Sequence, residues 1–260
     1  MSVSGAESPP EALRVVYADS WLLALDKPSG LLMHQEFGGR RETVVLVDLV
    51  RRALGVDVVY PLHRLDRGTS GVVLFALDLR TAREGGALFE NHAVAKTYVA
   101  LVRGRAPDLG IVAQPLTRRE GGPRVPAETA FGRLATVESE PRHVSLMEAH
   151  PRHGRQHQIR RHFRHLSHPL IGDNHHGRAD LNREFKARYG LGRLALHAAE
   201  LSLVHPRTGE RLRLSAPLPD DLGQPLLRLG FDPGLVAALA APASAPHAFV
   251  ATLAIPAPLD

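Results

Sequence analysis

Residues 63–71 read His63-Arg64-Leu65-Asp66-Arg67-Gly68-Thr69-Ser70-Gly71, and residues 72–76 continue with Val72-Val73-Leu74-Phe75-Ala76. The second segment is a short apolar run bounded by turn residues, which is typical of a buried strand. The turn before it places Asp66 between two arginines, where one ionised carboxylate can be held in place. Asp66 is therefore the first candidate for chemistry, and an ordinary surface ion pair with Arg64 or Arg67 is the alternative.

Strand and helix patterns surround this stretch without a regular βαβ alternation. Segments with strand character, many of them joined by short turns, lie at 14–17, 21–25, 96–102, 129–138 and 143–148. Segments with helical spacing of apolar residues lie at 43–54, at 78–92 and from Gly154 onward. Residues 105–128 are expected to be irregular. The pattern favours the α+β class, with a mixed, largely antiparallel central β-sheet and flanking helices and loops.

The 260 residues suffice for one large domain or two small ones. Residues 1–12 contain Ser, Glu, Gly and paired Pro and are expected to form a flexible leader. Residues 13–218 carry the strand and helix patterns of the main domain. Residues 219–260 are expected to be an Ala/Pro-rich C-terminal extension that is partly disordered, with one or two short helices within 226–240.

Composition excludes several classes of protein. No apolar run approaches a membrane span and the first residues do not form a signal peptide, so a cytoplasmic protein is expected. The absence of cysteine excludes disulfides, thiolate zinc sites and a cysteine nucleophile. Of the 32 basic residues only Lys27, Lys96 and Lys186 are lysine. An arginine-rich surface suits nucleic acid, and the positive charge is concentrated between Arg142 and Arg193; a G+C-rich coding bias is the alternative explanation for the arginine content.

Two further segments carry side chains suited to a site. Tyr98 lies on the predicted strand 96–102, where a phenol could stack against a base or could simply be a core tyrosine. Arg155 lies where the helix after Gly154 is expected to begin, a position that favours anions. It could clamp a phosphate or a catalytic carboxylate, or could belong to a solvated basic face.

Two other kinds of chemistry have little support. Fifteen histidines could in principle form a zinc site, through His162, His165 and His168 or through His175 and His176. These histidines lie among arginines, whose charge opposes a dication. Ser70 lacks the Gly-x-Ser-x-Gly turn of a serine nucleophile, so Asp66 stays the preferred centre.

The ordered motifs of the chain resemble RluA-type pseudouridine synthases. Residues 63–71 resemble the family signature, and the companion motifs follow in the family's order: Asp26-Lys27-Pro28-Ser29-Gly30-Leu31, Lys96-Thr97-Tyr98-Val99-Ala100, Gly154-Arg155-Gln156-His157-Gln158-Ile159-Arg160, His168-Pro169-Leu170-Ile171-Gly172-Asp173 and Leu196-His197-Ala198 with His205-Pro206. The resemblance spans about residues 13–218, which would be the catalytic domain. Within the family the chain most resembles the TruC type, which modifies uridine 65 of transfer RNA, through residues 160–169, His176-Gly177 and the insertion 178–193. Gly68 stands where proline is common in the family.

The resemblance implies an isomerisation of uridine to pseudouridine in RNA without a cofactor. It implies that Asp66 is the essential carboxylate, acting either as a nucleophile on C1′ or as a base at C2′. Arg155 would keep Asp66 ionised, Tyr98 would pack on the flipped base and could assist removal of the C5 proton, and Arg64 would fill the gap left by the base. The remaining expected RNA contacts, with the arginines on phosphates, are His63, Arg160, Arg161 and Arg164.

Transfer RNA is the expected partner. Ribosomal RNA is the alternative substrate, because synthases that act on it share the core motifs. A non-catalytic RNA-binding module and a metal-dependent hydrolase are the competing classes. No metal, no membrane and no protein partner are expected, and the chain is expected to be a monomer.

Overall fold

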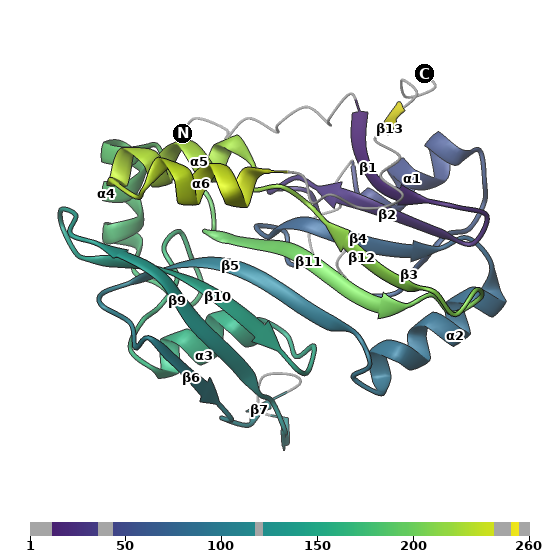
Figure 1. Cartoon of the computed structure of the whole chain (residues 1–260), viewed down its shortest axis with the longest axis horizontal. Helices are drawn as coiled ribbons and strands as arrows, with labels where there is room; N and C mark the ends of the chain where they lie inside the picture. The colour runs from purple at the N-terminus through teal and green to yellow at the C-terminus, as the bar shows by residue number, and fades with distance from the viewer. Residues whose placement is uncertain (1–11, 36–43, 118–121, 242–250, 255–260) are drawn as a thin grey trace.

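The computed structural model describes residues 12–35, 44–117, 122–241 and 251–254. Within these residues an eleven-stranded sheet runs through the molecule, and helices cover both of its faces (Figure 1). The pairs of strands are antiparallel except for one, so the predicted α+β class with a largely antiparallel central sheet is confirmed. None of the helices among the described residues is both long enough and apolar enough to cross a membrane.

The main path through the sheet follows an order that differs from the sequence. In spatial order its strands are β13 (Ala251–Ala254), β1 (Ala12–Ala18), β2 (Leu22–Lys27), β4 (Ser70–Ala76), β11 (Leu196–Val204), β5 (Ala95–Arg103), β10 (Val144–Pro151), β9 (Thr129–Val137) and β6 (Leu109–Val112). Two strands lie off this path, β12 (Arg211–Ser215) on β11 and β3 (Tyr60–Pro61) on β4. A separate hairpin is formed by β7 (Leu116–Thr117) and β8 (Arg124–Val125). The helices are α1 (Leu46–Leu54), α2 (Leu79–Glu90), α3 (Gln158–His165), α4 (Ala179–Tyr189), α5 (Asp220–Leu229) and α6 (Pro233–Ala240).

The parallel pair, β4 with β11, places the Asp66 turn beside β5. Gly71 lies opposite Ala198, and Ala198 lies opposite Tyr98 on its other side, so these three residues form a row across the sheet. Gly71 has a φ of 113°, and a Cβ built there would lie 2.1 Å from the carbonyl oxygen of Ala198. Both observations require glycine at this position. The row brings the start of β4, and the turn just before it, next to Tyr98.

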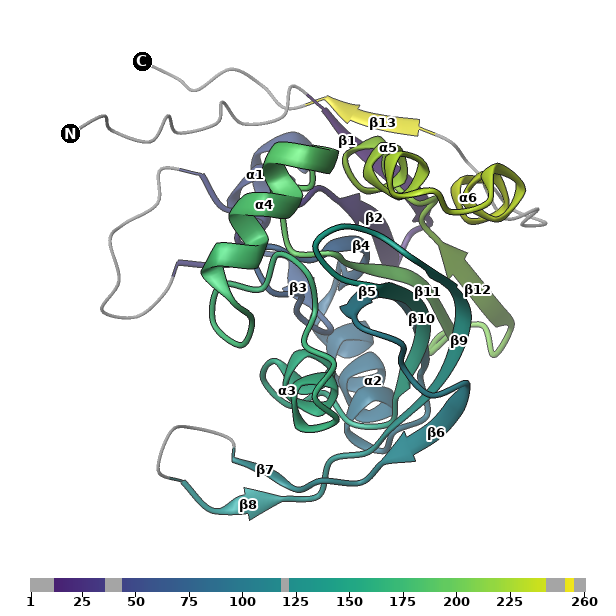
Figure 2. The same cartoon turned by 90° about the vertical axis from the view of Figure 1, so that its left-hand side faces the viewer.

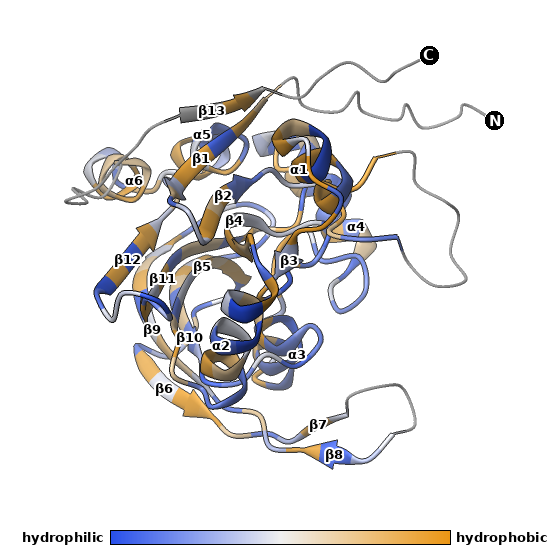
Figure 3. Cartoon of the chain, turned by 90° about the vertical axis from the view of Figure 1, so that its right-hand side faces the viewer, coloured by the Kyte–Doolittle hydropathy of each residue, from blue (hydrophilic) through white to orange (hydrophobic). Residues whose placement is uncertain are grey.

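The apolar run of β4 is buried on both faces, as predicted. Val73 and Phe75 pack in a cluster with α1, whereas Val72 and Leu74 pack in a cluster with β11 and β12. Hydrophobic residues are concentrated on the central strands, while α3 is largely hydrophilic (Figure 3). A strand fixed on both sides is a rigid support for the turn that precedes it.

The hydrophobic core continues past residue 218, where the sequence analysis ended the main domain. Leu222, Leu226 and Leu229 of α5 pack in one cluster with Leu101 and Leu146 of the sheet. The chain then returns to the sheet, because β13 pairs with β1. The helices within residues 220–240 therefore pack against the same sheet as residues 13–218. Residues 1–11, 242–250 and 255–260, on which the expected leader and disordered tail fall, lie outside the described residues.

Two local predictions were wrong. The helix expected from Gly154 begins at Gln158, because His157 has a φ of 53° and so adopts the left-handed conformation that an α-helix does not contain. Residues 105–128, expected to be irregular, contain β6, β7 and β8. Figure 2 shows that the β7–β8 hairpin lies next to α3.

Candidate active site around Asp66

Lys27 fixes the turn that carries Asp66. Its Nζ donates to the carbonyl oxygens of Pro28, Leu31 and Arg67 at 2.9, 2.8 and 3.2 Å, so each of the three donors of an ammonium group has a partner. The side chain is fully buried, and burial lowers the pKa of Lys27 to about 7. The backbone of Arg67, the residue after Asp66, is thus hydrogen-bonded to the last residue of β2.

Arg193 and Ser29 hold the next residue of the same turn. Arg193 donates from NH2 to the carbonyl oxygen of Gly68 at 3.4 Å and to Oγ of Ser70 at 2.7 Å. Ser29 Oγ donates to the same carbonyl oxygen of Gly68 at 2.8 Å. Since Ser29 follows β2 and Arg193 precedes β11, two distant parts of the chain fix the backbone beside the candidate carboxylate.

The ion-pair partner of Asp66 is Arg160 of α3. Arg160 NH1 donates to Asp66 Oδ2 at 2.9 Å, while its Nε and NH2 donate to Asp173 Oδ2 and Oδ1 at 2.7 and 2.8 Å. The side chains of Arg160 and Asp173 are 6% and 0% exposed, and that of Asp66 is 25% exposed. The expected phosphate contact of Arg160 is therefore wrong: its guanidinium is buried between two carboxylates.

Arg155, which the sequence analysis paired with Asp66, has another partner. Its Nε donates to the carbonyl oxygen of Pro126 at 3.1 Å. The assignment was wrong because α3 begins only at Gln158, so Arg155 lies in the preceding loop and Arg160 lies on the buried side of the helix. Arg155 still lines the cavity in which Asp66 lies.

Asp173 holds Arg160 in its orientation. Besides the bidentate contact with Arg160, its Oδ1 accepts the backbone N–H groups of His175 and His176, both at 2.9 Å. Burial by itself raises the pKa of Asp173, but Arg160 and these N–H groups outweigh burial and lower it to about 2. Asp173 is therefore a carboxylate at neutral pH, with its charge compensated inside the protein.

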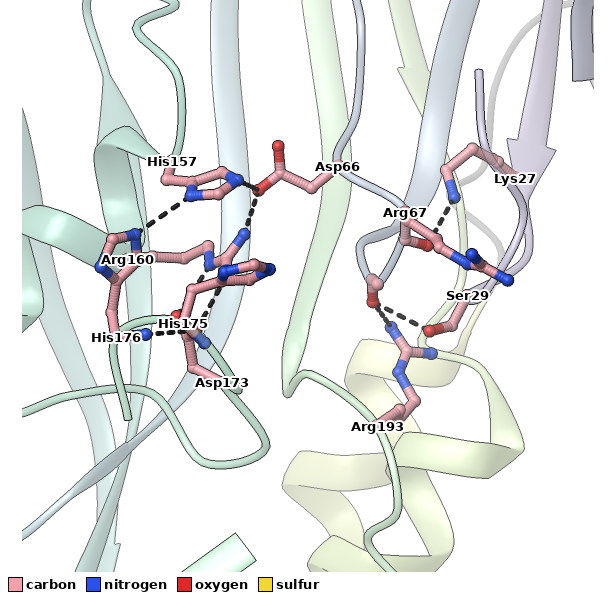
Figure 4. A network of polar contacts seen from close by, with 11 residues as sticks. Lys27, Ser29, Asp66, Arg67, His157, Arg160, Asp173, His175, His176 and Arg193 are labelled. Carbon is pink, nitrogen blue, oxygen red and sulfur yellow. Dashed lines mark hydrogen bonds and ion pairs between the residues drawn. The ribbon is translucent and has the colours of Figure 1, made fainter. Parts of the chain in front are cut away.

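His157 and His176 connect Asp173 back to Asp66 (Figure 4). His157 Nε2 lies 3.9 Å from Asp66 Oδ2, and its Nδ1 lies 3.0 Å from His176 Nε2. Burial lowers the pKa of both imidazoles, that of His176 to about 4, so both are neutral at pH 7. If His176 donates to Nδ1 of His157, the proton of His157 is on Nε2 and faces Asp66; we assign this tautomer from the contacts.

Asp66 lies in a cavity of about 880 Å³, a volume large enough for a nucleotide. Tyr98, Arg64 and His63 also line this cavity. Burial and the charge of Asp66 raise the pKa of Tyr98 far above its usual range, so its phenol is protonated at neutral pH. The cavity thus brings the carboxylate of Asp66 and the protonated phenol of Tyr98 into one space.

Comparison with known proteins supplies the family. Residues 21–165 match the family model described as RNA pseudouridylate synthase. The chain belongs to this family. It is similar to the tRNA pseudouridine synthase C of Vibrio cholerae, with 39% identity over 232 residues that cover 83% of this chain and 94% of that protein.

Two more comparisons agree with this assignment. The tRNA pseudouridine synthase C of Pectobacterium carotovorum is 41% identical over 222 residues, which cover 78% of this chain and 58% of that longer protein. The structure of human RNA pseudouridylate synthase domain containing 1 superimposes with a TM-score of 0.68, covering 84% of this chain and 89% of that one at 24% identity, and supports the fold. The protein is thus an isomerase that forms pseudouridine in RNA.

His63 and Arg64 stand at different depths in the cavity of this pseudouridylate synthase. The ring of His63 stacks on Phe89, with centroids 5.0 Å apart, and its Nε2 accepts the backbone N–H of Leu74 at 3.1 Å. Burial lowers the pKa of His63 to about 3, so the ring is neutral. Arg64 is exposed and lines the same cavity. Of the two, Arg64 is the side chain that can move when RNA binds.

Arg161 and Arg164 do not line the Asp66 cavity. They lie on the other side of α3, where they line a second, smaller cavity. Arg161 is fixed there by Thr117 of β7, to whose carbonyl oxygen and Oγ1 it donates at 3.0 and 3.1 Å. The three arginines expected on phosphates therefore divide into one buried residue and two at a separate surface.

Four residues of the site have roles that were not predicted from the sequence: Lys27, His157, Asp173 and Arg193. The first three stand in motifs that resemble the family's, which was the available signal. The histidine groups considered for zinc are engaged differently: His162 contacts Thr129 Oγ1 and the carbonyl oxygen of Gln114, both within 3.0 Å. In the described part of the chain no group of three His, Asp or Glu side chains is arranged to hold a metal ion.

Proposed function

We propose that this enzyme converts uridine 65 of transfer RNA into pseudouridine, with Asp66 as the essential carboxylate. The observation that carries the proposal is the ion pair of Asp66 with the buried Arg160, in a cavity large enough for a nucleotide. The relatives named tRNA pseudouridine synthase C support the substrate.

The reaction needs no external reactant. The N1–C1′ bond of uridine breaks, a C5–C1′ bond forms, and the C5 proton is replaced by one on N1, so atoms and electrons balance. Asp66 would either attack C1′ or remove a proton from C2′, and both routes need the carboxylate in its ionised form. Arg160 donates to Asp66 and orients it, and Asp173 fixes Arg160.

The base must leave its stack to reach Asp66. Arg64, exposed on the cavity wall, would fill the vacated place in the RNA, and Tyr98 would pack against the flipped base. The charge of Asp66 contributes to the raised pKa of the Tyr98 phenol. Once Asp66 is esterified or protonated this contribution disappears, so the pKa of the phenol falls. Tyr98 would then release its own proton more readily, and only as the phenolate would it accept the C5 proton.

The test is pseudouridine formation by purified protein on unmodified transfer RNA and on ribosomal RNA, mapped at base resolution with and without a chelator. We expect pseudouridine at position 65 of transfer RNA, unchanged by the chelator, and none with Asp66→Asn. Asp57→Asn, at an exposed site, is the matched control and should be fully active. Modification of ribosomal RNA alone would refute the substrate, and activity of Asp66→Asn would refute the mechanism.

Two further properties belong to the same proposal. One chain supplies the described walls of the Asp66 cavity, so we expect the monomer to be active. A transfer RNA substrate would also place the enzyme in the cytoplasm, as the sequence predicts. Size-exclusion chromatography with light scattering on the active preparation would test the first property.

A further inference from the structure

A second cavity lies between the β7–β8 hairpin and α3, which are neighbours in Figure 2. Its volume is about 340 Å³. Its walls include Thr117 and Arg124 of the hairpin, Arg161 and Arg164 of α3, and His176 from the loop before α4. None of its described lining residues is acidic. Three arginines without a carboxylate among the described lining residues favour a positive potential in this cavity.

We propose that this cavity binds a backbone phosphate of the substrate RNA, near the uridine that enters the Asp66 cavity. The proposal rests on the proposed function, which supplies the RNA. Guanidinium groups bind phosphate through two parallel N–H donors, and contacts of this kind position a nucleic acid without reading its sequence. The cavity would therefore add affinity and fix the position of the strand.

Arg161 is held in place before any RNA binds. NH1 donates to the carbonyl oxygen of Thr117 at 3.0 Å and NH2 to its Oγ1 at 3.1 Å. These bonds use two of the five N–H donors of the guanidinium, so others remain for a phosphate. A side chain already ordered loses little conformational entropy on binding.

Arg164 of α3 and Arg124 of the β7–β8 hairpin both line the cavity. Arg164 follows Arg161 by one helical turn, so the two project from the same side of α3. Both Arg164 and Arg124 are exposed, and neither makes an ion pair with a described carboxylate. Burial lowers the pKa of His176, and the positive charge of Arg164 lowers it further by a smaller amount. The charge of Arg164 is thus felt inside the cavity.

The two cavities share a wall. His176 lines the second cavity and His157 lines the Asp66 cavity, and their rings are in contact, with Nε2 and Nδ1 3.0 Å apart. A strand whose phosphate occupies one cavity can therefore place a neighbouring nucleotide in the other.

The first experiment measures the salt dependence of binding for Arg124→Gln, Arg164→Gln and the double variant. An unmodified transfer RNA transcript is titrated between 50 and 200 mM salt. Each substitution should weaken binding roughly tenfold at low salt and flatten the slope of log K against log [salt] by about one. KM should rise with kcat within about twofold. Arg52→Gln, an exposed arginine on α1 at the other end of the molecule, is the control and should leave the slope unchanged.

The second experiment locates the phosphate. Synthetic RNAs carrying the target uridine receive one neutral methylphosphonate linkage at a time. One linkage should weaken binding by the wild type and have little effect on the double variant. Wild-type slopes in both arginine variants, or equal sensitivity of wild type and double variant to every linkage, would overturn the proposal. If the wild type forms no pseudouridine, the proposed function fails, while the binding slopes still report on this cavity.

Discussion

Replacing Asp173 by Asn should make the protein less stable at neutral pH and nearly unchanged in stability at low pH. The carboxyl has a pKa of about 2 in the folded protein, against 3.8 for an unperturbed Asp. Its folded pKa is depressed, so the stabilisation is complete above pH 4 and is lost as the pH falls through 2. The shift corresponds to about 2 kcal/mol at pH 6 and about 1 kcal/mol at pH 3.

The same substitution should also lower the catalytic rate. Asn at position 173 can still accept the N–H groups of His175 and His176, but its amide can no longer accept both donors of Arg160. Arg160 then lacks the contact that fixes its orientation toward Asp66. We expect kcat to fall roughly 10- to 100-fold with RNA affinity within about threefold.

The assay is urea unfolding at several pH values between 6 and 3, combined with single-turnover kinetics. Asp180→Asn is the control: this carboxyl also has a pKa lowered to about 2, by a hydrogen bond from Arg178, but it is fully exposed. Solvent screens such a pair, so this variant should follow the wild-type pH curve. The reasoning about Asp173 is refuted if Asp173→Asn loses the same stability as the wild type over this pH range.

Three further predictions concern the support of Asp66. Lys27→Met should lower kcat about tenfold. In the wild type the buried ammonium deprotonates at a lower pH in the folded protein than in the unfolded chain, so the free energy of unfolding should rise by about 4 kcal/mol between pH 7 and 10. The variant should lack this rise, which urea unfolding at several pH values measures. Gly71→Ala should cost more than about 3 kcal/mol, since its Cβ would overlap a carbonyl oxygen, whereas Gly86→Ala in α2, with open space around it, should raise Tm slightly. His157→Asn places a residue that tolerates a φ of 53° at this position but removes the imidazole beside Asp66. The variant should have a kcat about tenfold lower and an unchanged Tm. A wild-type kcat would show that the imidazole has no part in orienting the carboxylate.

The parts of the fold that the sequence predicts well are those set by local pattern. The run 72–76 has apolar side chains at successive positions between turn residues, which is typical of a strand covered on both faces, and β4 is such a strand. The helical spacing in 78–92 likewise matches α2. The pairing of β4 with β11 could not be predicted from pattern, because it joins residues more than a hundred positions apart.

The candidate site shows the same limit at the scale of single side chains. The motif at 154–160 contains both Arg155 and Arg160, and the choice between them depends on where α3 begins. That start is set by the left-handed conformation of His157, which favours glycine or asparagine and has no clear signal when the residue is histidine. Lys27 was missed for a different reason: lysine is rarely buried, so composition alone places it at the surface.

The sharing of Arg160 between Asp66 and Asp173 gives the second carboxylate a role in the reaction of the first. An arginine paired with Asp66 alone could bind both of its oxygens and mask the group that must react. Asp173 instead takes two donors of Arg160, and NH1 goes to Asp66. Both Arg160 and His157 approach Oδ2 of Asp66, and Oδ1 is turned away from them (Figure 4). Asp66 is thus oriented through Oδ2 while Oδ1 is uncommitted to these partners, and either attack on C1′ or proton removal from C2′ requires such a free oxygen.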